Sequence, residues 1–274
     1  MRLRITHETI YHYDQPIDRA IEILRLTPQN HNGQYVSSWR LDVSTDGLLT
    51  RIEDPFGNIT HSLSFDGPLD RLIITAGGEV VTNDTAGIVR GARDRLPAGV
   101  FLRPTEFTET TPAIHALADG LFSEARDTLD FLHRLNMTVF DRFLLAPARH
   151  GAVRPAGEVL ADAEHPATPQ DLAHLFIALA RQAHVPARYV CGYLHRPEAS
   201  READAGHAWV EAFVEGLGWI AFDPSLGMCP VDAHVRVSIG LDCAGAAPIR
   251  GARAGGGQEE ISVNITVEEI SHGL

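Results

Sequence analysis

The chain has 274 residues, of which 44% are hydrophobic and 22% are charged, an ordinary globular mixture that excludes a disordered or fibrous protein. Acidic residues outnumber basic ones by 36 to 23, so the formal net charge at pH 7 is −13. Proteins that bind nucleic acid normally present a basic face to the phosphates, and this charge therefore argues against a nucleic-acid partner.

The three cysteines, Cys191, Cys229 and Cys243, form no close pair and no CxxC motif. We therefore expect neither a disulfide framework nor a cysteine-rich zinc site. Residues 1–6 alternate between polar and apolar and are followed by His7 and Glu8, unlike a secretory signal. No run reaches the ~18 apolar residues that a membrane helix needs. The sequence predicts a cytoplasmic protein without membrane association.

Residues 1–90 have the pattern of short strands. The segments 2–6, 21–26 and 38–43 lean toward alternation of apolar and polar side chains, and turn signals such as Asp14-Gln15-Pro16 separate them. This spacing predicts an antiparallel sandwich or open barrel. Its simplest role is that of a support or interaction domain.

After Pro104 the pattern becomes helical. Thr111-Pro112 predicts the start of one helix, and a second is expected from Ala125 to about Phe143. Residues 146–167 include Pro147, Pro155, Pro166 and Gly151, and much of this segment is predicted to be loop.

Thr168-Pro169-Gln170-Asp171 is a helix start by three criteria. Thr168 can cap the helix, proline suits the first helical position, and Asp171 completes a pattern similar to a capping box. The apolar residues that follow have helical spacing, so we expect one face of this helix to pack against a core.

Three strands are predicted after this helix, at residues 188–194, 207–214 and 219–224, with a loop at 196–204. Together they predict a buried helix followed by an antiparallel sheet. The tail returns to strands at 234–239 and 260–267, and the Gly-, Ala- and Arg-rich segment 250–257 is predicted to be a flexible loop.

Four blocks resemble bacterial transglutaminase-like proteins, distant papain-like relatives of transglutaminases: QDLAHLF (170–176), VPARYVCGY (185–193), GHAWVE (206–211) and GWIAFDP (218–224). The resemblance extends over essentially the whole chain. It implies an α+β fold with a β-sandwich-like domain at 1–100. Residues 101–274 would form a papain-like, transglutaminase-like domain of helices on an antiparallel sheet that includes the C-terminal strands.

The resemblance implies a Cys-His-Asp triad of the kind found in cysteine peptidases and transglutaminases. His207 matches the base and Asp223 the carboxylate that orients it, whereas Pro169 occupies the position of the nucleophilic cysteine. Proline has no thiol, hydroxyl or N–H, so it can neither attack an acyl group nor donate to an oxyanion. A helix tolerates proline in its first turn, so the fold can survive this change.

Other residues near the expected cleft could supply a reactive group. Thr168 precedes the nucleophile position by one residue, which on a helix directs it about 100° away. Cys191 is more simply explained as a small buried strand residue. Cys229 and Cys243 are weaker candidates than Cys191.

The remaining candidates in the cleft are Gln170, Asp171, His174 and Trp209. Asp171 and His174 could form a metal site with His207, but a helix cap and a buried histidine explain them more simply. Trp209 is either sheet core or a platform for a substrate. We expect no metal and no cofactor.

The preferred prediction is a catalytically inactive homologue, a pseudoenzyme that uses its cleft to bind a peptide or protein ligand or an active relative. One alternative is an active amide or peptide hydrolase or acyltransferase that uses another nucleophile or a metal-activated water near His207. Another is a structural protein whose β-domain binds the partner. The oligomeric state, the ligand and the choice between hydrolysis and amine transfer are left open by the sequence.

Overall fold

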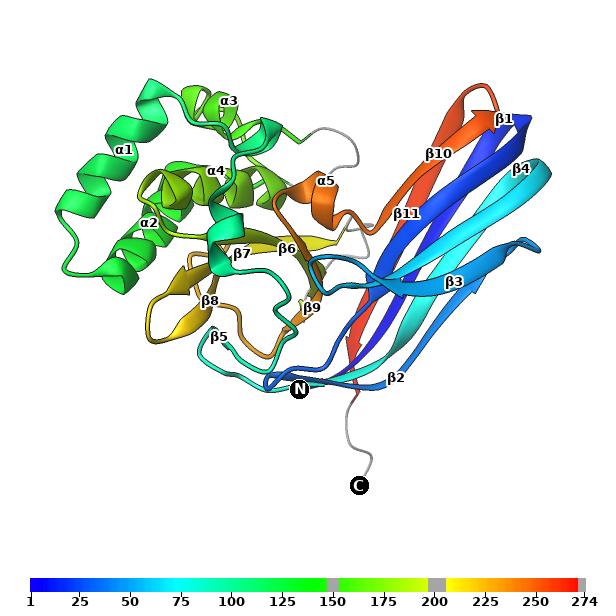
Figure 1. Cartoon of the computed structure of the whole chain (residues 1–274), viewed down its shortest axis with the longest axis horizontal. Coiled ribbons are helices and arrows are strands. Elements are labelled where there is room, and N and C mark those ends of the chain that lie inside the picture. The colour runs from blue at the N-terminus through cyan, green and yellow to red at the C-terminus, as the bar shows by residue number, and fades with distance from the viewer. Residues whose placement is uncertain (147–152, 197–205, 271–274) are drawn as a thin grey trace.

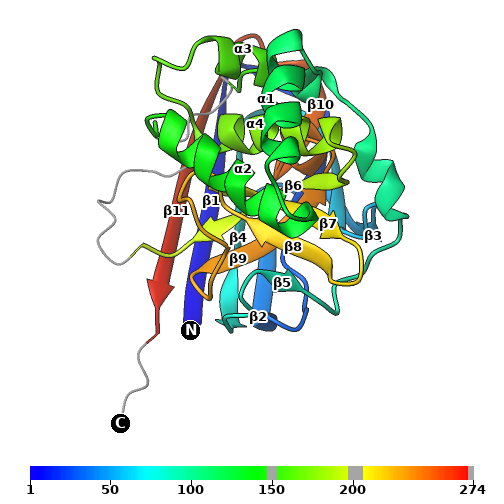
Figure 2. The ribbon, with the colours of Figure 1, turned by 90° about the vertical axis from the view of Figure 1, so that its left-hand side faces the viewer.

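The computed structural model describes residues 1–146, 153–196 and 206–270. A long-stranded β-domain packs beside a core domain of helices and strands (Figure 1). In the core domain, helices cover one face of a second sheet (Figure 2). This is the α+β architecture predicted from the sequence.

The β-domain is one antiparallel sheet of six strands: β1 (Arg2–Thr27), β2 (Gln34–Val43), β3 (Leu48–Glu53), β4 (Ile59–Thr82), β10 (Ile249–Gly255) and β11 (Glu259–Glu269). β1 and β4 pair with each other over nearly their full lengths. One hydrophobic core contains residues from both halves of β1, such as Tyr11 and Leu24, and from both halves of β4, such as Leu63 and Ile74. The two halves of the sheet therefore share one interior.

The C-terminal strands lie in this β-domain and not, as expected, with residues 101–248. β11 pairs with the first half of β1, and β10 pairs with the second half. β4 occupies one edge of β1, and the chain returns to cover the other, because an uncovered edge leaves backbone groups unpaired. The predicted loop at 250–257 is also wrong in part, since β10 covers most of it. Gly251 lies opposite Glu22, whose carboxylate occupies the space of a Cβ.

The second sheet has the order β5-β8-β7-β6-β9, formed by β5 (Ile88–Val89), β6 (Ala187–Leu194), β7 (His207–Val214), β8 (Gly218–Phe222) and β9 (His234–Gly240). Its helices are α1 (Pro112–Ser123), α2 (Thr128–Arg142), α3 (Ala156–Ala161), α4 (Pro169–Gln182) and the short α5 (Cys243–Ala246). Two 3-10 turns, Ala98–Leu102 and Glu106–Thr108, precede α1. α4 is buried along almost its whole length and forms the centre of the core.

Two boundaries differ from the predictions. α2 begins at Thr128 because Asp127 accepts a hydrogen bond from the backbone of Asp130, which fixes the cap there. α3 lies within the predicted loop at 146–167, where its apolar residues pack against the core. Residues 147–152 of the first predicted loop, and nearly all of the loop predicted at 196–204, lie outside the described residues.

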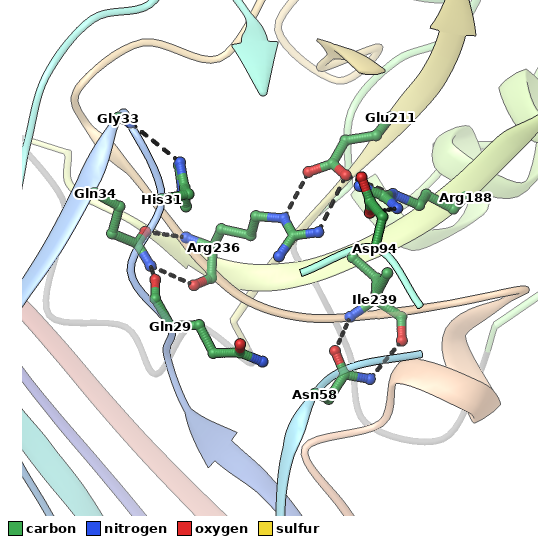
Figure 3. Close-up of polar contacts among 10 residues, drawn as sticks. All are labelled: Gln29, His31, Gly33, Gln34, Asn58, Asp94, Arg188, Glu211, Arg236 and Ile239. Carbon is green, nitrogen blue, oxygen red and sulfur yellow. Dashed lines mark hydrogen bonds and ion pairs between the residues drawn. The ribbon is translucent and has the colours of Figure 1, made fainter. Parts of the chain in front are cut away.

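Two amide side chains of the β-domain close the exposed edge of β9. Gln34 exchanges two hydrogen bonds of 2.8 Å with the backbone of Arg236, and Asn58 does the same with Ile239 at 2.8 and 2.9 Å (Figure 3). Each amide replaces a neighbouring strand at one residue of the edge. A small core of residues from both domains adds to this junction.

Among the described residues, no helix combines the length and the hydropathy needed to cross a membrane.

Candidate functional site

The start of α4 has the capping box that the sequence predicts. The Thr168 hydroxyl accepts a hydrogen bond from the backbone N–H of Asp171 at 3.2 Å, and the Asp171 carboxylate accepts one from the N–H of Thr168 at 3.1 Å. Pro169 is the first helical residue and is buried. The backbone of Arg154 donates a further bond of 2.8 Å to Asp171. Thr168 and Asp171 are thus engaged in holding the helix end.

The first turn of α4 lies at the same end of the sheet as His207. Arg181, near the end of α4, donates to the carbonyl of Ala187 at the start of β6 at 2.9 Å. The ring of His174, earlier in α4, lies 5.1 Å from the ring of Tyr189, which follows Ala187 in β6, so helix and strand run in opposite directions. The start of α4 is therefore directed toward the end of β6, where Gly192 pairs with His207 of β7.

His207 and Asp223 form a buried, hydrogen-bonded pair. The His207 Nε2 lies 2.6 Å from the Asp223 Oδ2, and the two residues are 4% and 0% exposed. An ionised carboxylate can only accept, so Nε2 carries the ring proton. The second ring nitrogen, Nδ1, points away from Asp223 and has no hydrogen-bond partner among the described residues.

Two residues that sequence reasoning missed complete the surroundings of Asp223. Ser225 donates its backbone N–H at 3.0 Å and its hydroxyl at 2.6 Å to Oδ1, and the His234 Nε2 lies 3.1 Å from Oδ2. Burial alone would raise the pKa of Asp223, but the attraction of His207 and the hydrogen bonds from both imidazoles hold it well below its ordinary value.

The sequence carries a signal for Ser225 but none for His234. Ser225 follows Asp223 by two residues, the spacing at which an aspartate side chain bonds to its own backbone in a turn. His234 reaches Asp223 only because β9 pairs with β6, where Leu194 lies opposite His234. No local pattern in the sequence predicts the pairing of β9 with β6.

His174 does not join His207. Its Nε2 accepts a hydrogen bond of 3.0 Å from the backbone of Cys243, and its ring lies between those of Phe107 and Tyr189. Burial lowers the pKa of His174 to about 4. It is a neutral core histidine at neutral pH.

The pKa values of all three thiols are raised rather than lowered. Burial raises the pKa of Cys191 to about 12, and burial together with Asp242 raises that of Cys243 to about 12. Burial also raises the pKa of Cys229. A thiol needs a lowered pKa to be a ready nucleophile at neutral pH, so these environments favour inert thiols.

Trp209 and Gln170 are the remaining predicted cleft residues. Trp209 is 2% exposed and packs in a cluster with Phe101 and Trp219, as a residue of the sheet core does. Gln170 lies in the first turn of α4, and its side-chain oxygen is buried without a hydrogen-bond partner among the described residues.

The only cluster of potential metal ligands in the described part of the chain is His207, Asp223 and His234. One ligand atom of each lies within 4.8 Å of the others. The backbone N–H of Val231, however, donates to the Nδ1 of His234 at 3.2 Å. A metal-bound histidine normally donates from its second nitrogen, so these contacts fit a hydrogen-bond network better than a metal centre.

Further along β7, Glu211 anchors the strand that carries His207. Its carboxylate lies 2.6 Å from Arg188 and 2.7 Å from Arg236, and Arg188 also pairs with Asp94 (Figure 3). Burial alone would raise the pKa of Glu211, but the two guanidinium groups lower it to about 2. The charges of this network compensate one another within the core.

Comparison with known proteins supports the same interpretation of the fold. Residues 3–81 match the bacterial transglutaminase-like N-terminal region, and residues 115–224 match the transglutaminase-like superfamily. An uncharacterized protein of Mycobacterium leprae is 26% identical over 98% of this chain and 99% of its own length. One of Mycobacterium tuberculosis H37Rv is 27% identical over 91% of this chain and 87% of its own.

The structure of a protein from Cytophaga hutchinsonii, described as a candidate cysteine protease, covers 100% of this chain with a TM-score of 0.78. The two chains are 19% identical, and the alignment covers 92% of that protein. This likeness shows a common fold. The two family matches place residues 115–224 in the transglutaminase-like superfamily and residues 3–81 with the N-terminal region of its bacterial members.

Proposed function

We propose that this protein is a non-catalytic member of its superfamily that binds a peptide or protein ligand in the cleft between the start of α4 and His207. The observation that carries the proposal is Pro169 at the first position of α4. A nucleophile at this position would benefit from the helix dipole and from the free backbone N–H groups of the first turn. Proline supplies no nucleophile and removes one of these N–H groups.

The other side of the cleft supports a binding role. The Nδ1 of His207 has no hydrogen-bond partner in the described part of the chain, while its other nitrogen is fixed by Asp223. Gln170 contributes a buried oxygen without a partner in the described structure. Polar groups of this kind fix the orientation of a ligand within a mostly apolar cleft.

An active hydrolase remains the second candidate because His207, Asp223 and His234 lie close enough to share a metal ion. In that case water would have to be activated near His207. The hydrogen bond from Val231 to His234 disfavours this arrangement, and the raised pKa values of the thiols disfavour a displaced nucleophile.

A peptide library screened against the intact protein tests where ligands bind. A Gln170→Trp substitution should fill the cleft and abolish binding of the selected peptides. A matched Leu48→Trp substitution, at a residue 69% exposed on β3, should leave binding unchanged. Loss of binding in the Leu48 variant alone would instead place the ligand on the β-domain.

An assay for turnover tests the lack of catalysis. The wild-type protein should neither hydrolyse peptide amides nor be labelled by acyl-thiol probes. Turnover that disappears in His207→Ala, or stoichiometric labelling of Cys191, would contradict the proposal.

A further inference from the structure

His234 is the first residue of β9. The contacts around its ring allow only one position for the ring proton. The N–H of Val231 donates to Nδ1 at 3.2 Å, which requires a lone pair on that nitrogen. The proton of the neutral ring must then be on Nε2, which lies 3.1 Å from the Asp223 Oδ2. His234 is therefore a donor to Asp223.

The carboxylate of Asp223 is saturated by this contact. Oδ1 accepts from the backbone N–H and the hydroxyl of Ser225, and Oδ2 accepts from His207 and His234. An ionised carboxylate offers about four lone-pair positions, so every one is used. Rotation of the carboxylate would break bonds at both oxygens, and its plane is fixed.

The ring of His234 is itself held from several directions. It is 7% exposed and meets the Trp209 ring edge-on, with centroids 5.4 Å apart. β9 is anchored to the β-domain by Gln34 and Asn58 (Figure 3). The domain junction thus supports His234, which contacts the Asp223 carboxylate of the His207–Asp223 pair.

We infer that His234 is a positioning residue that fixes the Asp223 carboxylate and thereby holds His207 with its proton on Nε2 and its lone pair on Nδ1. The inference goes beyond the proposed function, because it concerns the state of the imidazole whether or not the cleft binds a ligand. It also defines the ligand chemistry: Nδ1 presents an acceptor, which suits an amide N–H or a hydroxyl donor rather than a carboxylate.

Nuclear magnetic resonance of the intact protein with ¹⁵N-labelled histidine tests this directly. Two-bond ¹H–¹⁵N correlation spectra report which ring nitrogen is protonated, and no ligand is required. In the wild type, His207 and His234 should both carry the proton on Nε2. The His207 signals are assigned by their loss in His207→Gln.

Two variants separate positioning from simple packing. In His234→Phe, which removes the donor, His207 should become a mixture of tautomers, and its ring proton should exchange with water roughly tenfold faster, as expected for loss of one charge-assisted hydrogen bond. His234→Gln can still donate to Asp223 and should restore most of the wild-type signal. His7→Phe, at another buried histidine, should leave the His207 signals unchanged.

An unchanged His207 spectrum in a folded His234→Phe variant would overturn the inference. A wild-type His234 without a proton on Nε2 would do the same, even if both variants failed to fold. If one equivalent of zinc removed the Nε2 protons of both rings, His234 would be a metal ligand instead. The failure of peptide binding would affect none of these outcomes.

Discussion

The two sides of the proposed cleft differ in how their polar groups are held. On the helix side, Thr168, Pro169 and Asp171 form a local cap within four consecutive residues. On the strand side, His207 begins β7, Asp223 directly follows β8 and His234 begins β9, and the three side chains are hydrogen-bonded in the core. A local cap can lose the side chain at its first helical position at little cost. A buried network leaves a polar or charged group unpaired when any member is lost.

Under the function we propose, this difference would explain how the fold tolerates proline at the position of a nucleophile while His207 and Asp223 stay paired. The residue at the first helical position takes no part in the capping bonds, and proline lacks only an N–H that the helix does not use. The imidazole and its carboxylate are buried, and the carboxylate also accepts hydrogen bonds from Ser225 and His234. Their retention follows from stability even where no reaction depends on them.

The largest expected effect tests the cost of an unpaired charge on the strand side. Glu211→Gln leaves Arg188, which is 1% exposed, and Arg236 without their shared counter-charge. We expect a loss of about 3–5 kcal/mol in the free energy of unfolding, measured with urea. Glu79→Gln, which affects ion pairs on the exposed surface, should cost far less, because solvent screens those pairs. Equal losses of unfolding free energy in the two variants would contradict the difference expected between buried and exposed charges.

Acid should destabilise the buried core of the helix-and-strand domain. Glu211 has a pKa of about 2 in the folded protein, below its unfolded value of ~4.3, so its stabilisation is complete above that value and is lost as the pH falls toward 2. His174, with its pKa lowered to about 4, begins to destabilise the fold once the pH falls below ~6.5. Thermal unfolding between pH 7 and 3 should show a steady decrease in melting temperature; a flat profile would contradict these pairings.

A smaller effect is expected for the helix cap. Thr168→Ala removes the acceptor for the N–H of Asp171 and should cost about 1 kcal/mol. Circular dichroism with urea unfolding measures this loss, and Thr168→Ser should restore most of it. A loss of unfolding free energy as large as that of Glu211→Gln would mean that the stability of the cap depends on contacts beyond residues 168–171.

The smallest effect is expected at Pro169. Pro169→Ala should change the free energy of unfolding by less than about 1 kcal/mol, since proline contributes there mainly by limiting the unfolded chain. The same urea titration measures it. A loss of several kcal/mol would show that the ring of Pro169 packs in the core and is not merely a tolerated residue of the helix cap.

The sequence predicts the local features of this molecule better than the distant ones. The cap at Thr168 and the start of α4 follow from four residues, and the three strands from β6 to β8 follow from short apolar patterns. The position of His234 depends on the pairing of β9 with β6, and β10 and β11 return to a strand more than 200 residues earlier. No local pattern encodes such contacts, so these were missed or assigned to the wrong domain.

The most direct test of the missing nucleophile is the pKa of a thiol introduced by Pro169→Cys. The side chain would lie at the start of α4, at the same end of the sheet as His207, and both the helix dipole and the imidazole favour a thiolate. The pH dependence of alkylation should give a pKa clearly below ~8.5, the value of a free cysteine, and His207→Ala should raise it again. A thiol at residue 169 that titrates like a free cysteine, in a folded variant, would contradict the placement of the cleft.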